Sequence, residues 1–450
     1  MYLLRILNYW IIASILWFSA LYSDECISGK CQNGQGSMIF SNGDTYTGGF
    51  KNGKFHGRGM LTFAPRDKKE EVDSEGSILY LYVSKYSGEF RDGKFHGQGT
   101  IYFINGNEYE GEFKDDSMSG RGIYSFANGS KYNGDFLDDK KHGSGVLTFA
   151  NGEKYIGEFK NDKIDGVGTF YYFNGDKYTG EFKNEKKHGK GSYHFANGKK
   201  YEGEFKFDKR DGKGAYIYPN GAKYNGEFKE DKFFGEGSIK YSNGVIYTGG
   251  FNDYKFHGYG TIEYPSGAKY TGEFKEGKFD GKGVYLFPSG KKYEGDFKEG
   301  KFDGQGVYTY ANGDKYIGQF KNGKFDGLGS ISLAKGDKFE VEFKDGKFNG
   351  KGTVKYSNGD KYDGEFKDGK KNGSGLLIFA DGGSYKGEFK DDKSHGKGIL
   401  IFADGTKYIG DFENDKFNGY GTMYDADGNV IYSGKWMGGD PDDKKHNSHE

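Results

Sequence analysis

The chain repeats one short aromatic unit, Tyr-x-Gly-Glu/Asp-Phe, at a step of 23 residues from Tyr46 to Tyr432, with few interruptions. A fixed period of this length is typical of stacked supersecondary units rather than of one globular core. Because the chain supplies many copies of the unit, equivalent positions can be compared within this one sequence. The clearest copies contribute Tyr109, Gly111, Phe113, Tyr155, Gly157, Phe159, Tyr178, Gly180 and Phe182.

The composition favours one elongated, ordered body over separate domains or a disordered chain. Charged residues make up 29% of the 450 residues, which alone would suggest disorder, but aromatic residues make up 18% and the period is strict. Acidic and basic residues are interleaved and leave a net charge of −1, so no broad electrostatic field exists to attract a polyanion. We therefore expect no nucleic-acid partner.

A two-residue turn follows the phenylalanine of each unit. The segments Phe50–Phe55 and Phe320–Phe325 carry Asn-Gly at their centres, and this dipeptide favours a hairpin because both turn positions need positive φ. Counting outward from the turn predicts which residues face each other on the two strands. The predicted pairs are Phe50 with Phe55, Gly48 with Gly57, and Tyr46 with Gly59.

A second turn precedes the tyrosine of each unit, and we predict that it has three residues. The positions of Leu147 and Phe149 are apolar in the copies compared, whereas the residue between them varies freely and must be exposed. A type I turn closed by a left-handed glycine places both on the side of Tyr155, and it explains prolines at positions that this turn favours. The prolines are Pro219, Pro265 and Pro288, and the predicted pairs are Leu147 with Tyr155, Gly145 with Gly157, and Gly143 with Phe159.

Together the turns predict an all-β fold, an elongated single-layer antiparallel meander of tandem hairpins. One face carries the rings and glycines of the unit, and the other carries Glu158, Lys160 and their equivalents. Rings that cover strands without Cβ atoms offset the cost of glycine in a strand. Because a single layer cannot bury its apolar face completely, we expect the aromatic face to stay partly open and to bind another protein or a second copy.

The N-terminal residues predict export or membrane anchoring. Arg5 precedes an apolar stretch from about Tyr9 to Tyr22, so residues 1–23 have the charge order and length of a secretory signal peptide, or of an uncleaved signal anchor. The array would then lie in the secretory lumen, outside the cell or at a membrane. Cys26 and Cys31, in a predicted linker over residues 24–33, are expected to form a disulfide there, the alternative being idle thiols.

Other segments are expected on the surface of the array, which we predict over residues 34–436. Asn128 and Asn372 begin Asn-x-Ser sequons on predicted turns and would accept glycans in a lumenal protein. Residues 66–83 interrupt the period and predict a charged insertion loop. Residues 437–450 predict a disordered polar tail.

The order of these features resembles the MORN repeat (membrane occupation and recognition nexus): Tyr-x-Gly-x-Phe, a turn, His/Asp-Gly-x-Gly, and Asn-Gly ahead of the next tyrosine. The resemblance implies extended β-hairpin arrays that serve as scaffolds, dimerise and lie at membrane-apposed structures, with phospholipid binding often proposed. One copy departs from the pattern, because Val341 stands where the glycine should be between Phe339 and Phe343. We expect a local kink or weakened stacking there.

No catalytic or metal site stands apart from the repeat. Several histidines precede Gly-x-Gly, but the same position elsewhere holds Asp165, Asp211, Asn349 or Ser119. That interchange fits a polar residue that bonds a local turn better than a metal ligand. We predict no enzyme, no metal, no cofactor and no small-molecule substrate.

The leading hypothesis is a non-enzymatic structural scaffold, a protein-interaction rod of the secretory pathway or its membranes, with a protein partner or a homodimer. The alternative is a membrane-tethering module that binds phospholipid, including phosphoinositide, through lysine and aromatic side chains on turns. The near-neutral charge weighs against strong electrostatic attachment. The cytoplasmic face of a membrane is the alternative location.

Overall fold

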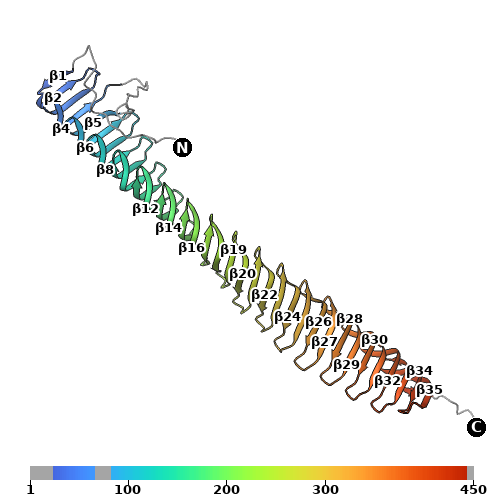
Figure 1. Ribbon diagram of the computed structural model, residues 1–450. Coiled ribbons are helices and arrows are strands. Elements are labelled where there is room, and N and C mark those ends of the chain that lie inside the picture. The colour runs from blue at the N-terminus through green and yellow to red at the C-terminus, as the bar shows by residue number, and fades with distance from the viewer. Residues whose placement is uncertain (1–23, 66–82, 443–450) are drawn as a thin grey trace, which may run out of the picture. The chain divides into compact units, whose positions relative to one another are not determined.

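The computed structural model describes residues 24–65 and 83–442, and their regular structure is all β-strand. The chain divides into two compact units, residues 1–231 and 232–450. Within each unit, consecutive strands pair antiparallel, as for β10, which pairs with β9 and β11. Figure 1 shows the strands following one another in chain order. The all-β meander of tandem hairpins is therefore confirmed.

The first unit contains strands β1 to β17. They are β1 Glu25–Gly29, β2 Asn33–Ile39, β3 Thr45–Lys51, β4 Lys54–Thr62, β5 Val83–Arg91, β6 Lys94–Phe103, β7 Glu108–Lys114, β8 Ser117–Ser125, β9 Lys131–Leu137, β10 Lys140–Thr148, β11 Lys154–Lys160, β12 Lys163–Tyr171, β13 Lys177–Lys183, β14 Lys186–His194, β15 Lys200–Lys206, β16 Lys209–Ile217 and β17 Lys223–Lys229.

The second unit contains strands β18 to β36. They are β18 Lys232–Lys240, β19 Ile246–Asn252, β20 Lys255–Glu263, β21 Lys269–Lys275, β22 Lys278–Leu286, β23 Lys292–Lys298, β24 Lys301–Thr309, β25 Lys315–Lys321, β26 Lys324–Ser332, β27 Lys338–Lys344, β28 Lys347–Lys355, β29 Lys361–Lys367, β30 Lys370–Ile378, β31 Ser384–Lys390, β32 Lys393–Ile401, β33 Lys407–Glu413, β34 Lys416–Tyr424, β35 Val430–Met437 and β36 Asp440–Pro441.

The three-residue loops form as predicted. Between β10 and β11 the Phe149 N–H donates to the Glu153 carbonyl at 2.9 Å, and the Gly152 N–H donates to the Phe149 carbonyl at 2.9 Å. Gly152 has a φ of 89°, the left-handed conformation that closes a type I turn in a hairpin. Leu147 then lies opposite Tyr155. The register that puts both on one face is therefore correct.

The two-residue turns also form as predicted, with positive φ at both positions. Asn52 and Gly53 have φ values of 52° and 70°, and Lys51 lies opposite Lys54 across the turn. Many copies manage the same backbone without glycine, as at Asn161 and Asp162 with φ values of 49° and 68°. Asparagine and aspartate tolerate the left-handed region better than other non-glycine residues.

The register predicted beyond the two-residue turn is wrong after the first pair. Phe50 does lie opposite Phe55, but Gly48 lies opposite Gly59 rather than Gly57, and Tyr46 lies opposite Leu61 rather than Gly59. The second strand carries two extra residues in a β-bulge around Gly57, whose φ is 71°. Counting outward with a period of two could not detect a bulge, because a bulge changes the count.

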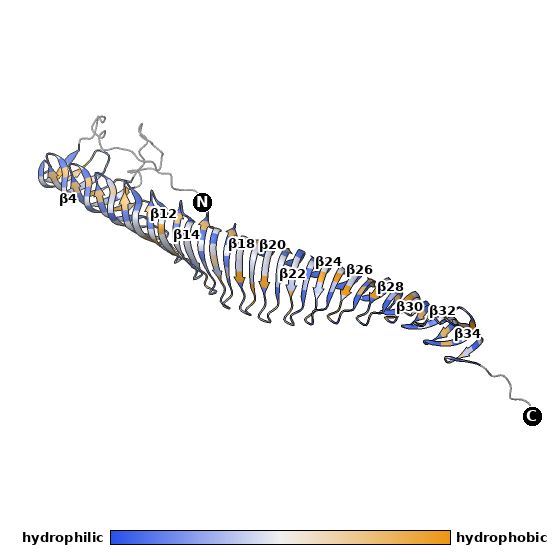
Figure 2. Cartoon of the chain, turned by 60° about the horizontal axis from the view of Figure 1, so that its bottom comes forward, coloured by the Kyte–Doolittle hydropathy of each residue, from blue (hydrophilic) through white to orange (hydrophobic). Residues whose placement is uncertain are grey.

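In each half of the chain the strands form a sheet with two faces. The inner face is defined by the tyrosine, glycine and phenylalanine of the repeat, and the outer face by the residues that alternate with them. In β11 the inner residues Tyr155 and Phe159 are buried, while the outer residues Ile156, Glu158 and Lys160 are exposed. Figure 2 shows hydrophobic and hydrophilic residues alternating along the strands. This alternation is typical of a sheet with one buried face.

Two predicted segments need correction, and two others lie wholly or mostly outside the described residues. The predicted linker 24–33 contains strand β1, which pairs with β2, and the predicted disordered tail 437–450 contains the last residue of β35 and strand β36, which pairs with β35. The predicted signal segment 1–23, most of the insertion loop (66–82) and residues 443–450 lie outside the described residues. The described residues contain no helix long and apolar enough to cross a membrane.

Candidate binding surface

The predicted inner-face residues form a closed core. The rings of Tyr109, Tyr155 and Tyr178 are 0% exposed, and Phe113, Phe159 and Phe182 are 3%, 3% and 6% exposed. Gly111, Gly157 and Gly180 lie between them in their strands. The expectation that this face stays partly open at the repeated rings is therefore wrong. These buried rings hold the sheet together, whereas Leu147 and Phe149 on the same side are half-buried.

Each tyrosine ring folds back over its own strand. The Tyr178 hydroxyl donates a hydrogen bond to the Glu181 carbonyl at 2.8 Å, and the ring lies over Gly180 and Gly191. A Cβ on Gly180 would lie 2.6 Å from the Tyr178 hydroxyl oxygen, closer than atoms can pack. The glycines are required because the ring occupies the space of their side chains, so a single layer can bury a large aromatic residue without a second layer.

Neighbouring 23-residue repeats pack against each other through these rings. Tyr155 makes edge-to-face contacts with Phe159 of its own repeat at 5.2 Å and with Phe182 of the next repeat at 5.2 Å between ring centroids. Tyr178 repeats the pattern with Phe182 and Phe205, both at 5.0 Å. Aromatic pairs in this geometry add about 0.5–1.5 kcal/mol each beyond area burial. The core is thus a continuous chain of ring contacts within each unit.

The side of each tyrosine ring that points away from its strand is covered by the residue nine positions later. In several copies this residue is phenylalanine, as where Phe95 stacks on Tyr86 at 3.8 Å with an interplanar angle of 13°. In other copies it is a cation, as where the Lys371 Nζ lies 5.4 Å from the centroid of the Tyr362 ring. Both covers exclude water, and the cation gains from the negative face of the ring.

Burial changes the acidity of the tyrosines. Desolvation raises the pKa of Tyr155 and Tyr408 to about 12, and it also raises the pKa of Tyr178 and Tyr270. Desolvation disfavours the charged tyrosinate, because the ionised oxygen would lose its hydration in the core. The hydroxyls are therefore structural donors rather than acid–base groups at neutral pH.

The copy with Val341 solves the packing problem differently. Val341 is 2% exposed and fills the space that a tyrosine ring covers elsewhere. Phe339 lies partly exposed, and its ring centroid is 5.6 Å from that of Phe348 at 39°, instead of the 3.8 Å stack. The predicted weakening of the stacking is confirmed, while Val341 still lies opposite Gly352 in the usual register.

The position before Gly-x-Gly does bond a turn, but the turn belongs to the next hairpin. The Asp165 carboxylate accepts the Asn184 N–H at 3.0 Å. The turn itself makes a second pair of bonds to the preceding hairpin: the Asp162 N–H donates to the Lys141 carbonyl, and the Asp162 carboxylate accepts the Lys141 N–H, both at 3.0 Å. The bond from the turn N–H explains why aspartate recurs at this position, whereas the buried Nδ1 atoms of His142 and His188 there have no hydrogen-bond partner among the described residues. Among residues 24–65 and 83–442, no cluster of three or more histidine, cysteine, aspartate or glutamate side chains could hold a metal.

The acidic residue of the repeated unit satisfies the backbone at the bulge. The Glu181 carboxylate accepts the Lys190 N–H at 2.9 Å, and Glu273 accepts the Lys282 N–H at 3.0 Å. The bulge interrupts the ladder at these N–H groups, and a carboxylate on the opposite strand replaces the missing carbonyl. This role accounts for the Glu/Asp in the sequence pattern, which sequence reasoning had placed only on an exposed face.

Removing that carboxylate should loosen its own hairpin. We expect Glu181→Ala to destabilise the β13–β14 hairpin by about 1 kcal/mol, because the Lys190 N–H loses its acceptor. Glu181→Gln keeps an acceptor oxygen, and Gln319 occupies the equivalent position naturally, so this variant should cost less. Hydrogen exchange at Lys190 reads the effect directly. Equal protection in both variants and the wild type would contradict the bridging role.

The outer face is hollowed over the last hairpins of the second unit. The hollow has a volume of about 1030 Å³ and is lined by strands β29 to β35. Leu376, Ile399, Ile409 and Tyr420 are among the residues that line it. Ile399 lies directly opposite Ile409, and Tyr420 is 72% exposed. We call these four residues the outer apolar patch. Solvent-exposed apolar residues gathered in a hollow are typical of an interaction site.

Charged side chains border the outer apolar patch. The Lys397 Nζ lies 3.0 Å from the Asp411 carboxylate, and this pair holds the Asp411 pKa below its usual range. Lys386 and Glu388 also line the hollow. Sequence reasoning missed this surface. The position after the tyrosine holds isoleucine at Ile409 but also at Ile156 and Ile317, which do not line the hollow, so the residue type alone does not mark it.

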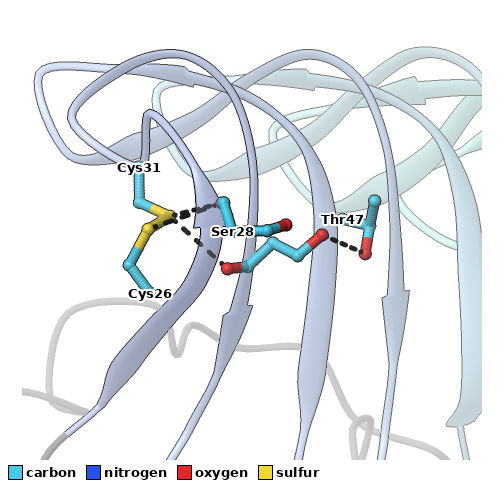
Figure 3. The surroundings of a disulfide bond; sticks show 5 residues. Cys26, Ser28, Cys31 and Thr47 are labelled. Atoms are coloured by element: carbon cyan, nitrogen blue, oxygen red, sulfur yellow. Dashed lines mark hydrogen bonds between the residues drawn. A yellow bond between two sulfur atoms is a disulfide. The ribbon is translucent and has the colours of Figure 1, made fainter.

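The two cysteines form a disulfide, as predicted. Figure 3 shows the bond between Cys26 in β1 and Cys31 beyond its end, with an S–S distance of 2.09 Å. Their sulfurs lie 3.5–3.7 Å from the carbonyl oxygens of Ser28 and Ser37, and these are packing contacts because a disulfide sulfur carries no proton. The bond closes the end of the hairpin formed by β1 and β2.

The two sequons occupy different kinds of site. Asn128 lies in an exposed three-residue loop, as predicted. The prediction that Asn372 lies on a turn is wrong, since it belongs to strand β30 and precedes the bulge residue Gly373, whose φ is 92°. Asn-Gly serves a bulge there and a turn elsewhere, because both need a left-handed glycine.

Comparisons with known proteins identify the repeat. A family model described as the MORN repeat matches seventeen stretches of the chain. They are residues 32–45, 46–68, 86–108, 109–131, 132–154, 155–177, 178–200, 201–223, 224–246, 247–269, 270–292, 293–315, 316–338, 342–361, 362–384, 385–407 and 408–430. A search of curated proteins finds no match.

Two of the solved structures with some likeness to this chain come from animals. The TCP domain of SAS-4 from Drosophila melanogaster, solved with a proline-rich motif of Ana2, is 18% identical, with 35% of this chain and 85% of that chain covered and a TM-score of 0.22. The TCP10 domain of CPAP from Danio rerio is 12% identical, with 54% and 98% covered and a TM-score of 0.17. At these scores the likeness carries no argument about a partner.

Proposed function

The chain belongs to the MORN-repeat family, and from this premise we propose that it is a non-enzymatic scaffold that binds another protein on the outer face of its hairpins. The observation that carries the proposal is the outer apolar patch, Leu376, Ile399, Ile409 and Tyr420, in a hollow of about 1030 Å³. Burying such residues against a partner is favourable at about 25 cal/mol per Å².

The non-enzymatic part of the proposal rests on how the polar groups are used. The acidic residues of the repeated unit accept backbone N–H groups at the bulges, as Glu181 does, and the tyrosine hydroxyls donate to backbone carbonyls, as Tyr178 does. The hollow is open to solvent and is bordered by a neutralised pair, Lys397 with Asp411. A site of this kind suits recognition, which needs area, rather than proton transfer, which needs a desolvated group with a tuned pKa.

A photoreactive amino acid placed in the hollow tests this function. We expect a photo-crosslinker at Ile409 to give adducts of higher mass in cells, and a crosslinker at Thr271, in the same row of the outer face, to give few. Sedimentation of the purified protein distinguishes the occupants, since a strict monomer at micromolar concentration removes self-association. If Ile409 yields no more adducts than Thr271, the hollow is not the interface.

The alternative function is a phospholipid-binding, membrane-tethering module. It is favoured by lysines that face each other across the two-residue turns, as Lys160 faces Lys163 and Lys183 faces Lys186. Many of the second lysines are paired with acids of the next turn, as Lys278 is with Glu299 at 3.5 Å, so the field at this edge is weakened. Co-sedimentation with anionic vesicles at low salt decides the matter, and no binding discards this alternative.

We also propose that the array works in the lumen of the secretory pathway, outside the cell or anchored at a membrane, with the cytoplasmic face of a membrane as the alternative. The disulfide between Cys26 and Cys31 supports an oxidising compartment. The loop position of Asn128 leaves its side chain accessible to glycosylation.

Protease protection and glycosidase treatment test the location. A lumenal protein should be protected from protease in intact microsomes, and a glycosidase should lower its mass unless Asn128 is changed to glutamine. A protein that is digested in intact microsomes and carries two free thiols would place the array in the cytoplasm.

A further inference from the structure

The three-residue loops place an Asn-Gly pair at the most exposed point of many hairpins. Asn-Gly sequences are prone to spontaneous deamidation, because glycine hinders the reaction least. The glycine nitrogen attacks the asparagine side-chain carbonyl carbon and forms a five-membered succinimide, and ammonia leaves with the amide nitrogen. Water then opens the ring at either carbonyl and gives aspartate or isoaspartate, so no other reactant is needed. A chain with so many Asn-Gly loops would be expected to age quickly in water.

The loop at Asn151 holds each group that must move for this reaction. The attacking nitrogen, that of Gly152, donates its proton to the Phe149 carbonyl at 2.9 Å. The Asn151 side-chain oxygen accepts the Glu153 N–H at 3.1 Å, and the Asn151 side-chain nitrogen donates to the Glu153 carboxylate at 3.1 Å. Attack requires the side chain to turn toward Gly152 and the Gly152 N–H to leave its acceptor, so these bonds must break first.

The same arrangement recurs along both units. The glycine N–H donates to the residue three positions earlier, and the asparagine oxygen accepts the N–H two positions later. The loops with both bonds centre on Asn42, Asn105, Asn128, Asn151, Asn174, Asn197, Asn220, Asn243, Asn312 and Asn358.

We propose that the hairpin loops suppress deamidation, so that these asparagines react only when a loop opens. The rate in the folded protein then follows the fraction of time that each loop is open rather than the intrinsic reactivity of Asn-Gly.

The chain itself indicates which product the loop accepts. Asp381 and Asp404 occupy the asparagine position in other loops, where their carboxylates accept the N–H of Gly383 and Thr406, each at 2.9 Å. Conversion to aspartate therefore preserves the loop. Isoaspartate inserts an extra backbone carbon and shifts the glycine out of its turn, so that product is the damaging one.

Peptide mapping by mass spectrometry tests the proposal on the full-length protein. One sample is kept folded and one is unfolded in guanidinium chloride, at the same temperature and mildly alkaline pH, with circular dichroism to verify both states. We expect conversion at Asn128, Asn151 and Asn174 to be at least about tenfold slower in the folded sample, since the hydrogen bonds of the loop must open before the glycine nitrogen can attack. Equal rates in the two samples would overturn the proposal.

A matched variant tests the second half of the argument. Asn151→Asp should fold and melt like the wild type, because Asp404 already occupies an equivalent loop. A marked loss of thermal stability in this variant would show that the loops do not accept the aspartate product.

Discussion

Replacing Gly180 with valine should unfold the hairpins around it. We expect a loss of about 3 kcal/mol or more, because overpacking and backbone displacement act together at one site. A Cβ at this position would lie 2.6 Å from the Tyr178 hydroxyl oxygen and 2.5 Å from the Gly191 Cα. The ring must leave the core, and its contacts with Phe182 and Phe205 leave with it.

The matched control is the neighbouring residue. Thr179 is exposed on the outer face, so Thr179→Val introduces the same side chain one position away and should change stability by less than about 0.5 kcal/mol. Repeat arrays can lose structure locally, so hydrogen exchange across β13 and β14 should be measured in addition to thermal unfolding. Equal effects of the two valines would refute the requirement for glycine beneath the ring.

The chain contains a natural precedent for a compensated change. Phe339 and Val341 together replace the usual tyrosine and glycine, and Phe339 lies partly exposed without a hydroxyl to satisfy. Adding Tyr178→Phe to Gly180→Val should therefore recover about 1 kcal/mol, as a coupling in a double-mutant cycle. Strict additivity would mean that the two changes at 339 and 341 are unrelated.

The protein should unfold at alkaline pH, between about pH 10 and pH 12. The pKa of tyrosine in an unfolded chain is about 10, whereas desolvation raises the pKa of Tyr155, Tyr316, Tyr385 and Tyr408 to about 12. In that window the folded state binds more protons than the unfolded state, so stability is complete below pH 10 and falls as pH rises. Many tyrosines act together, which makes the total effect large.

Tyrosinate absorbance and far-ultraviolet circular dichroism, followed together against pH, measure this transition. The late-titrating tyrosines should ionise as the strand signal is lost. Tyr155→Phe combined with Tyr316→Phe removes two ionising groups and should move the transition to higher pH. If those tyrosines ionise near pH 10 while the strands remain, the hydroxyls are not held in a desolvated core.

The fold could be predicted from the sequence because equivalent positions can be compared among the many copies of the repeat. The free variation of Thr148 between Leu147 and Phe149 was enough to choose a three-residue loop, and Leu147 does lie opposite Tyr155. The bulge at Gly57 escaped prediction because the glycine that forms it looks like any other in Gly-x-Gly, and only its φ of 71° distinguishes it. Missing the bulge also hid the reason for the acidic residue at Glu181, which bridges it.

The site was predicted less well, for a physical reason. The argument that one layer cannot close its apolar face ignored a ring that folds back on its own strand, as Tyr178 does over Gly180. Because the glycines provide the space for the ring, the repeated rings are buried within a single layer. On the outer face, Ile409 lies opposite Ile399 in the hollow, a pairing that depends on the faces and the register of the strands rather than on the residue type alone.

The direction of the backbone bonds has a mechanical consequence. Bonds between antiparallel strands run across the strands, so within each unit they point along the direction in which hairpins are added. Tension applied in that direction breaks these hydrogen bonds one strand pair after another. The hydrogen bonds between Asp162 and Lys141 add a further connection between neighbouring hairpins. Under tension, each unit would lose its hairpins one at a time and re-form them when the tension is released. The unit would therefore extend and recover like a spring.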